Sequence, residues 1–242
     1  MRAVVTRVVT AFVVLAVTAG YARGAFVCGD VNNNGGINTS DALLVLKKGV
    51  GQPVDLVCGP TGQPAQTGQT TCYKAGVVSA CEGTGQDGEL RTGVARSFTD
   101  NGDGTITDNA TGLMWEKQSD DGTIHDKDNM YTWNNVFASK VATLNSEAFA
   151  GYSDWRVPNE FELYSLVNLG ADHPATYSVF NSDCVEACTV LTCSCPPTGT
   201  HWSSSTYHST PSAAWVVHFY DGTTYLYHKD FSNFVRAVRS GS

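Results

Sequence analysis

Residues 98–116 read FTDNGDGTITDNATGLMWE, and this stretch sets the fold class. Turn signals at 101–102, 103–104 and 109–112 separate short runs of strand-forming residues. The spacing predicts one strand over 105–107 and the next over 113–115. Two short strands joined across a tight turn are typical of an antiparallel sheet.

Two helices and a second group of strands follow. The apolar spacing from Trp133 to Leu144 predicts one helix, and Pro158 and Gly170 mark the start and end of another. Trp155 and Arg156 are expected to fix this second helix, with the indole in the core and the guanidinium on a carboxylate. Further strands are predicted at 201–205, 213–220, 223–229 and 234–239. The order of strands, two helices, a long loop and strands predicts an α+β domain with a mostly antiparallel sheet.

Five stretches of this region resemble a known family in the order in which they occur: GTITDNATGLMW, GYSDWRVPNEFEL, HWSSSTY, AAWVV and FVRAVR. They are similar to the Lcl C-terminal domain family, named for a collagen-like bacterial surface adhesin, and we place this domain at 72–241. The resemblance implies a C-type lectin-like fold whose terminal strands pair with each other. It also implies extracellular binding or adhesion and carries over no catalytic residue.

Charge and missing motifs narrow the function. The chain has 242 residues and a formal net charge of −8, which excludes a nucleic-acid binder with a basic face and disfavours the sulfated glycans associated with the family's adhesin. Nucleophile-elbow, zinc-protease and phosphate-loop motifs are absent from the sequence. A carboxylate pair from Glu116, Glu160 and Glu162 would suit a glycosidase, but solvated helix faces explain such acids as well. We therefore expect a binding protein and no enzyme. The alternative is an enzyme on a lectin-like scaffold, of the formylglycine-generating or glycan-processing kind, which would need a reactive cysteine.

Residues 1–24 have the pattern of a secretory signal peptide. Arg2 and Arg7 precede an apolar run, and small residues follow. We expect cleavage after Ala22 or Gly24. Removal of residues 1–24 takes away three arginines and no acid and changes the formal net charge from −8 to −11. No later stretch has the ~18 consecutive apolar residues of a membrane helix. The pattern predicts a secreted protein, extracellular or at the cell surface, with the periplasm as the alternative.

A calcium loop is predicted directly after the signal. Residues 30–41 place oxygen side chains in the ligand order of an EF-hand loop, with Gly35 at the sharp turn and a helix following. The stretch GDVNNNGGINTSDALLVLKKGVG resembles a dockerin type I repeat. The resemblance implies one Ca²⁺ with these ligands: Asp30, Asn32, Asn34, the Gly36 carbonyl, Asn38 and Asp41. The alternative is an Asn/Gly-rich turn without a metal.

We place this small calcium loop–helix module at 25–59 and a Gly/Pro/Gln/Thr-rich linker at 60–71. Dockerins carry two repeats, and only one is recognisable in this chain. A single repeat does not support docking to cohesin, the usual partner of dockerins.

The eight cysteines favour disulfides in an exported protein. The expected pairs are Cys28–Cys58, Cys72–Cys81 and, in an order that the spacing leaves open, Cys184 and Cys188 with Cys193 and Cys195. The alternative for the last four is a zinc site with four thiolate ligands, although the C-x3-C-x4-C-x-C spacing differs from the common paired C-x2-C.

The hairpin over 213–229 predicts where a ligand binds. A two-residue turn at Asp221-Gly222 would pair His218 with Tyr225, and paired residues share a face. Flat rings with polar tips can lie against a sugar and bond its hydroxyl groups. The hypothesised ligand face consists of Trp202, His218, Tyr220, Tyr225 and Tyr227, and its ligand would be a glycan or an extracellular protein. The alternative is that these tyrosines only stack across strands or cover a loop.

Overall fold

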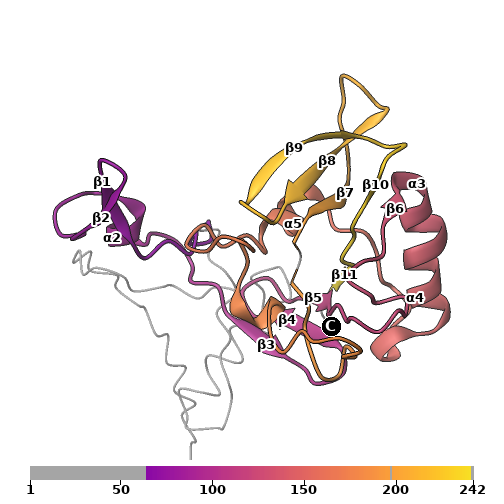
Figure 1. The fold of residues 1–242 in the computed structure, drawn as a ribbon. Coiled ribbons are helices and arrows are strands. Elements are labelled where there is room, and N and C mark those ends of the chain that lie inside the picture. The colour runs from indigo at the N-terminus through magenta and orange to yellow at the C-terminus, as the bar shows by residue number, and fades with distance from the viewer. Residues whose placement is uncertain (1–63, 197, 241–242) are drawn as a thin grey trace, which may run out of the picture. The chain divides into compact units, whose positions relative to one another are not determined.

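The computed structural model describes residues 64–196 and 198–240 (Figure 1). The predictions for the signal peptide at 1–24, for the calcium loop at 30–41 and for the Cys28–Cys58 pair lie outside the described residues. None of the described helices has the length and apolar character needed to cross a bilayer.

The described residues form short strands that pair into antiparallel sheets, with a few short helices between them. The strands are β1 (Cys72–Lys74), β2 (Val77–Ser79), β3 (Phe98–Asp100), β4 (Thr105–Asp108), β5 (Leu113–Glu116), β6 (Tyr131–Thr132), β7 (Thr200–Thr206), β8 (Ala213–His218), β9 (Thr223–His228), β10 (Ser232–Asn233) and β11 (Val238–Ser240). The helices are α2 (Asp87–Leu90), α3 (Trp133–Asn135), the π-helix η1 (Val136–Val141), α4 (Ala142–Ser146), the 3-10 helix η2 (Phe149–Gly151), α5 (Glu160–Tyr164) and the 3-10 helix η3 (Ser178–Phe180). The α+β class with antiparallel pairing is therefore confirmed.

The two main sheets have the orders β11-β5-β4-β3 and β7-β8-β9. In the first sheet the β4 and β5 strands form where the sequence predicts them, and Ile106 lies opposite Trp115 with both side chains fully buried. The strand nearest the C-terminus, β11, joins the same sheet beside β5, with Val238 opposite Trp115. The end of the domain is thereby tied to its first strands.

The strand expected over 234–239 is shorter than predicted because its two ends are hydrogen-bonded to different sheets. Phe234 exchanges hydrogen bonds with β7, through its N–H to Thr200 O and its carbonyl to Trp202 N. Strand β11 begins only at Val238, where pairing with β5 takes over. The segment between them connects the two sheets.

The first expected helix is present, and the second is shorter than expected. Helical structure is continuous from Trp133 to Ser146 through α3, η1 and α4, with a π-helical centre. Of the second helix only α5 forms. It starts at a capping box between Asn159 and Glu162, and Arg156 donates two 2.7 Å hydrogen bonds to the Glu162 carboxylate. Trp155 is buried, so the predicted fixing of this helix is confirmed.

The β8–β9 connection corrects the predicted register. His218 pairs with Thr223, so the loop between the strands has four residues, 219–222, and not two. The carbonyl of Phe219 accepts from Ala175 N at 2.7 Å, and that of Tyr220 accepts from His173 N at 3.0 Å. Pairing with β9 ends early because another segment uses these groups. The shift is two residues, so each side chain keeps its predicted face.

The described part of the expected linker is packed against the domain. Val94 N donates to Pro64 O, Gln66 N donates to Val94 O, and Leu169 N donates to Thr67 O, all at 2.8–2.9 Å. From residue 64 onward the segment is therefore part of the folded unit, because its backbone groups are hydrogen-bonded to two distant parts of the chain.

Candidate ligand-binding face

Exposed and half-exposed rings follow one another along the β8–β9 hairpin, and we call this series the aromatic row. Its members are, in spatial order, His173, Tyr220, His218, Tyr225, Tyr227 and Phe231. Neighbouring ring centroids lie 3.8, 5.9, 6.2, 6.2 and 5.6 Å apart in that order. These are ring-contact distances, so the row is continuous.

Strand alternation builds the centre of the row. Tyr225 and Tyr227 are two residues apart on β9 and therefore point to the same face as His218 at the end of β8. Tyr220 joins from the β8–β9 loop, where Gly222 adopts φ +78° and its N–H donates to His218 O. The predicted gathering of these four residues is what the structure has, despite the corrected register.

Several members of the row are open to solvent. Tyr220, Tyr225 and Phe231 are 50%, 36% and 59% exposed. Tyr227 is half-buried against the core cluster that contains Ala214 and Val216. The Tyr225 hydroxyl lies 2.6 Å from Thr200 Oγ1, which fixes the direction of its polar tip.

Carboxylates border the row. Asp172 lies 3.1 Å from His173 Nδ1, and Asp221 lies 3.1 Å from His218 Nδ1. Hydrogen bonds from the Thr223 hydroxyl and N–H, helped by His218, lower the pKa of Asp221 to about 2. Asp221 is therefore charged at neutral pH, and the row presents acidic edges that disfavour a polyanionic ligand.

Trp202 was expected in the ligand face and does not belong to its surface. Its side chain is fully buried, and its Nε1 donates to Tyr131 O at 2.8 Å. The ring meets Tyr227 edge-on with centroids 5.9 Å apart, so Trp202 supports the row from beneath. The indole is buried because both faces of β8 are covered: Val217 packs into one core cluster and Val216 into another.

Sequence reasoning missed two members of the row. Phe231 lies three residues after the end of β9, so its short distance from Tyr227 along the chain could have indicated it. His173 lies far away in sequence. It is held at the row by hydrogen bonds from its own N–H to Tyr220 O and from Ala175 N to Phe219 O, and the sequence has no local signal for either contact.

A second group of polar residues lies in the interior of the same domain, all of them buried except the half-buried His125, and we call it the charged network. Its members are Glu116, Gln118, His125, Lys140 and Arg236. The Glu116 carboxylate accepts from Lys140 Nζ and lies 2.7 Å from His125 Nδ1. Arg236 donates to the Glu116 carbonyl at 2.9 Å and to Gln118 Oε1 at 3.0 Å.

The electrostatics of the charged network fit a structural role. Burial alone would raise the pKa of the Glu116 carboxyl, but Lys140 and His125 outweigh it and lower this pKa to about 2. Glu116 is therefore an ionised, fully buried partner and not a proton donor. Glu162 is held by Arg156, so two of the three acids considered for a glycosidase pair are engaged in ion pairs.

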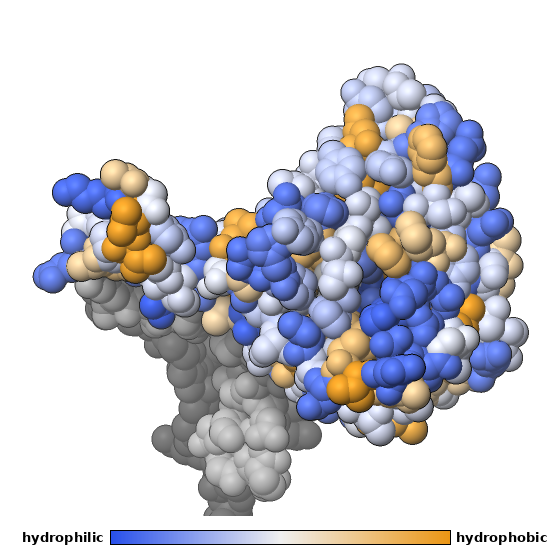
Figure 2. Space-filling model, in the orientation of Figure 1, coloured by the Kyte–Doolittle hydropathy of each residue, from blue (hydrophilic) through white to orange (hydrophobic). Residues whose placement is uncertain are grey.

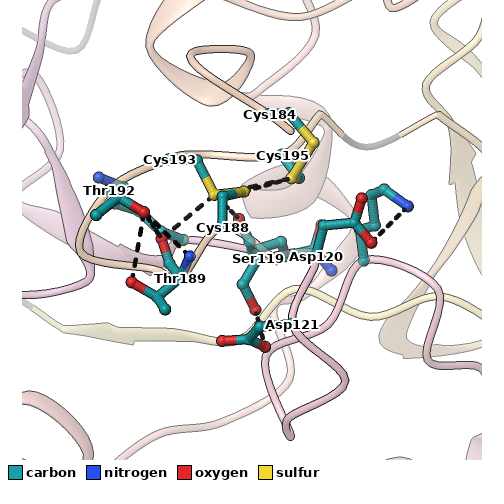
Figure 3. Close-up of a disulfide and its surroundings, with 12 residues drawn as sticks. Ser119, Asp120, Asp121, Cys184, Cys188, Thr189, Thr192, Cys193 and Cys195 are labelled. Carbon is teal, nitrogen blue, oxygen red and sulfur yellow. Dashed lines mark hydrogen bonds and ion pairs between the residues drawn. A yellow bond between two sulfur atoms is a disulfide. The ribbon is translucent and has the colours of Figure 1, made fainter. Parts of the chain in front are cut away.

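The described cysteines are all paired. Cys72–Cys81 is present as predicted, and the order left open by the sequence is Cys184–Cys195 and Cys188–Cys193. The four cysteines of 184–195 lie together beside Ser119 and Asp120 (Figure 3). Within the described residues, no cysteine is free.

Three carboxylates on the 119–129 loop also lie close together: Asp120, Asp126 and Asp128. Lys127 Nζ lies 3.2 Å from Asp120 and 2.7 Å from Asp128. Asp126 accepts hydrogen bonds from Gly122 N and from Asp128 N. These partners account for the cluster, and we assign no ion to it.

Surface apolar groups occur away from the row as well. A groove of about 490 Å³ lies between the 64–67 segment and α5, where Phe161 is 84% exposed. On the lobe formed by β1, β2 and α2, hydrophobic side chains also reach the surface (Figure 2), including Val77 and Val78. Both surfaces lack the ring-to-ring continuity of the row.

These features define a disulfide-bonded α+β domain that has an exposed ring surface and buried ion pairs. The sequence model of the Lcl C-terminal domain matches residues 104–239, and the chain belongs to this family. The match begins at the turn before β4 and includes the aromatic row, the charged network and the four clustered cysteines. Membership suggests a surface-associated, adhesin-like protein. No curated protein matches the chain.

Proposed function

We propose that this chain is an exported binding protein that recognises a neutral saccharide through the aromatic row. The observation that carries the proposal is the unbroken series of ring contacts from His173 to Phe231 along the β8–β9 hairpin. A lectin-like fold, expected from the family resemblance, would suit such a role.

The chemistry of the row matches the two kinds of surface on a sugar. Ring faces of Tyr220 and Tyr225 offer apolar area to the C–H side of a pyranose, and their hydroxyl groups can bond sugar hydroxyls. The carboxylates of Asp172 and Asp221 accept hydrogen bonds from hydroxyls but repel sulfate and carboxylate. The row therefore favours a neutral ligand over a sulfated one.

The alternative of an enzyme on a lectin-like scaffold is less well supported. A formylglycine-generating type of chemistry would use a reactive thiol. The six cysteines that the structure describes are all in disulfides, and the buried acid Glu116 is held in an ion pair. These observations favour binding over catalysis.

The test is an array of neutral and sulfated oligosaccharides probed with the full chain and with Tyr220→Ala/Tyr225→Ala. We expect binding to neutral members and at least ~10-fold weaker binding by the double variant, because two stacking surfaces are lost. Tyr73→Ala is the matched control, since Tyr73 is 51% exposed on the β1 strand outside the row. Phe161→Ala tests the groove on α5.

Three results would contradict the proposal: undiminished binding by the double variant, loss of binding only in Phe161→Ala, and binding confined to sulfated glycans. Circular dichroism of each variant establishes that a loss of binding is not a loss of fold.

We also propose that the 30–41 loop binds one Ca²⁺ through Asp30, Asn32, Asn34, the Gly36 carbonyl, Asn38 and Asp41. The ligand order in the sequence supports it. Only two of these groups are carboxylates, so we expect a Kd on the order of 10⁻⁴ M or somewhat lower, as in extracellular sites. Calorimetry should detect calcium binding by the full chain and none by Asp30→Ala. A wild-type chain that binds no calcium would refute this proposal without affecting the aromatic row.

A further inference from the structure

The four sulfur atoms of the 184–195 loop form one cluster and not two separate bridges (Figure 3). Cys188 Sγ lies 3.7 Å from Cys195 Sγ, which belongs to the other disulfide, and Cys193 Sγ lies 4.0 Å from Cys195 Sγ. The sulfurs of Cys184, Cys188 and Cys195 are all within 4.8 Å of one another. A tetrahedral zinc ion with Zn–S bonds of about 2.3 Å holds its sulfurs about 3.8 Å apart. Two of the sulfur–sulfur contacts between the two disulfides, Cys188–Cys195 and Cys193–Cys195, have about that spacing.

The backbone that carries the cluster is held by hydrogen bonds that do not depend on the disulfides. Cys195 N donates to Gln118 O at 2.7 Å, and Cys188 O accepts from Asp120 N at 3.0 Å. Ser182 and Ser194 exchange two backbone hydrogen bonds. Reduction would therefore leave the four thiols close together.

The surroundings also fit a bound metal. Cys188, Cys193 and Cys195 are buried, which closes the site and is typical of structural zinc. A zinc ion with four thiolates carries a net charge of −2. Arg236 donates from Nη2 to Cys195 O at 2.8 Å, and its buried Nε has no hydrogen-bond partner in the described structure. Its positive charge lies where it would offset the thiolates.

We propose that the 184–195 loop is a redox-switched zinc site. Each disulfide accepts two electrons and two protons from a dithiol reductant, which leaves as its own disulfide. The four resulting thiols release their protons as they bind one Zn²⁺. In the reverse direction, two molecules of a peroxide each take two electrons from a pair of thiolates and two protons from solvent. Each hydrogen peroxide leaves as two waters, and each alkyl peroxide leaves as one alcohol and one water. Two S–S bonds form and Zn²⁺ is released.

The switch gives the loop a cross-link under both conditions. Under oxidising conditions two disulfides tie 184–195 to itself, and under reducing conditions one metal ion joins the same four positions. In either state the Cys195 carbonyl remains in place against Arg236, above the charged network.

Metal titration of the reduced full chain tests this proposal. Co²⁺ is the spectroscopic probe, because tetrahedral thiolate coordination gives it intense visible absorption, and Zn²⁺ is then added to displace it. We expect one Co²⁺ per chain after reduction by a dithiol and none before. Cys72→Ser/Cys81→Ser should bind as the wild type does, whereas Cys188→Ser/Cys193→Ser should lose stoichiometric binding. Peroxide should release the metal and restore two disulfides, as intact mass would record.

Two further measurements keep the outcome decisive. Circular dichroism in the reduced, metal-loaded state must match that of the oxidised chain, and a reduced chain that unfolds and binds no metal overturns the proposal. So does binding that survives in Cys188→Ser/Cys193→Ser, because the metal would then be held elsewhere. The variant Cys28→Ser/Cys58→Ser/Cys72→Ser/Cys81→Ser retains only the four clustered cysteines and should still bind one ion.

Discussion

The aromatic row and the charged network are both chains of polar and aromatic side chains, yet they lie in opposite environments. Tyr220, Tyr225 and Phe231 of the row are exposed to solvent and contact neighbouring rings of the row. Glu116, Lys140 and Arg236 are buried, and each is hydrogen-bonded to another member of the charged network. Water cannot reach these groups to replace a lost partner. The difference indicates which region serves the fold and which is free to serve a ligand, because removing a group costs far more where water cannot take its place.

Breaking the ion pair should have the largest effect. Lys140→Met leaves the Glu116 carboxylate buried without its cation, and we expect a loss of about 3–5 kcal/mol in the free energy of unfolding. Lys127→Met is the matched control, since Lys127 pairs with Asp120 and Asp128 at the surface and should lose less than about 1 kcal/mol. Urea denaturation measures both. The double variant Glu116→Gln/Lys140→Met should be more stable than Lys140→Met, because no carboxylate is then left buried without a cation. Equal losses in Lys127→Met and Lys140→Met would contradict the expected difference between a surface and a buried ion pair.

The second largest effect should come from acid, which should lower the free energy of unfolding through the buried side chain of His201. Burial lowers the pKa of His201 to about 3, against an ordinary value near 6.5, with a hydrogen bond to Gly199 O opposing the shift. As the pH falls below 6.5, His201 becomes protonated in the unfolded chain but stays neutral in the folded chain. The free energy of unfolding therefore decreases from pH 6.5 towards pH 3. We expect about 2–3 kcal/mol of this loss between pH 7 and pH 4.5.

The variant His201→Gln should flatten this part of the stability profile, whereas His208→Gln, at an exposed position, should not. Below pH 4.5 the lowered pKa of Glu116 adds a second loss that continues towards pH 2, in both variants. Identical slopes for wild type and His201→Gln between pH 7 and pH 4.5 would show that this histidine is not the titrating group.

The smallest effect should be a difference in stability between alanine variants at two positions of the aromatic row. Tyr227→Ala removes a half-buried ring that packs on Trp202, and we expect a loss of about 2 kcal/mol. Tyr225→Ala removes a ring at the exposed surface and should lose less than about 1 kcal/mol. Thermal and urea unfolding measure the two losses of stability. Both variants replace a tyrosine of β9 with alanine, so only the burial of the ring differs between them. Equal losses would mean that the row has no buried side.

The sequence predicted the main elements where periodicity and turn residues are local. The β4–β5 strands, the helical stretch from Trp133, the Trp155–Arg156 pair and the Cys72–Cys81 bridge follow from neighbours along the chain. The β8–β9 register was wrong because the 173–175 segment takes the Phe219 and Tyr220 carbonyls, and no hairpin rule includes so distant a competitor. Because side chains alternate with a period of two, the two-residue shift left Tyr225 and Tyr227 on the same face as His218.

Burial could not be predicted at the same level. Trp202 has the ring and the polar tip of a ligand contact, but it is buried in the core cluster that contains Ala214 and Val216. This burial depends on tertiary packing and cannot be read from the sequence around Trp202. The charged network was missed entirely. Glu116, Lys140 and Arg236 belong to three separate segments, and each charge by itself is typical of a solvated surface.

The π-helix η1 has a consequence for how relatives of this domain should align. A π-helical turn holds one residue more than an α-helical turn over the same rise, so it marks the place of a single-residue insertion in an ordinary helix. A relative that lacks that residue would run straight from α3 to α4 as an ordinary α-helix, and the side chains on either side of the gap would keep the faces they have here. In aligned sequences, a one-residue gap within 136–141 should therefore coincide with an unchanged apolar residue at the position of the buried Leu144.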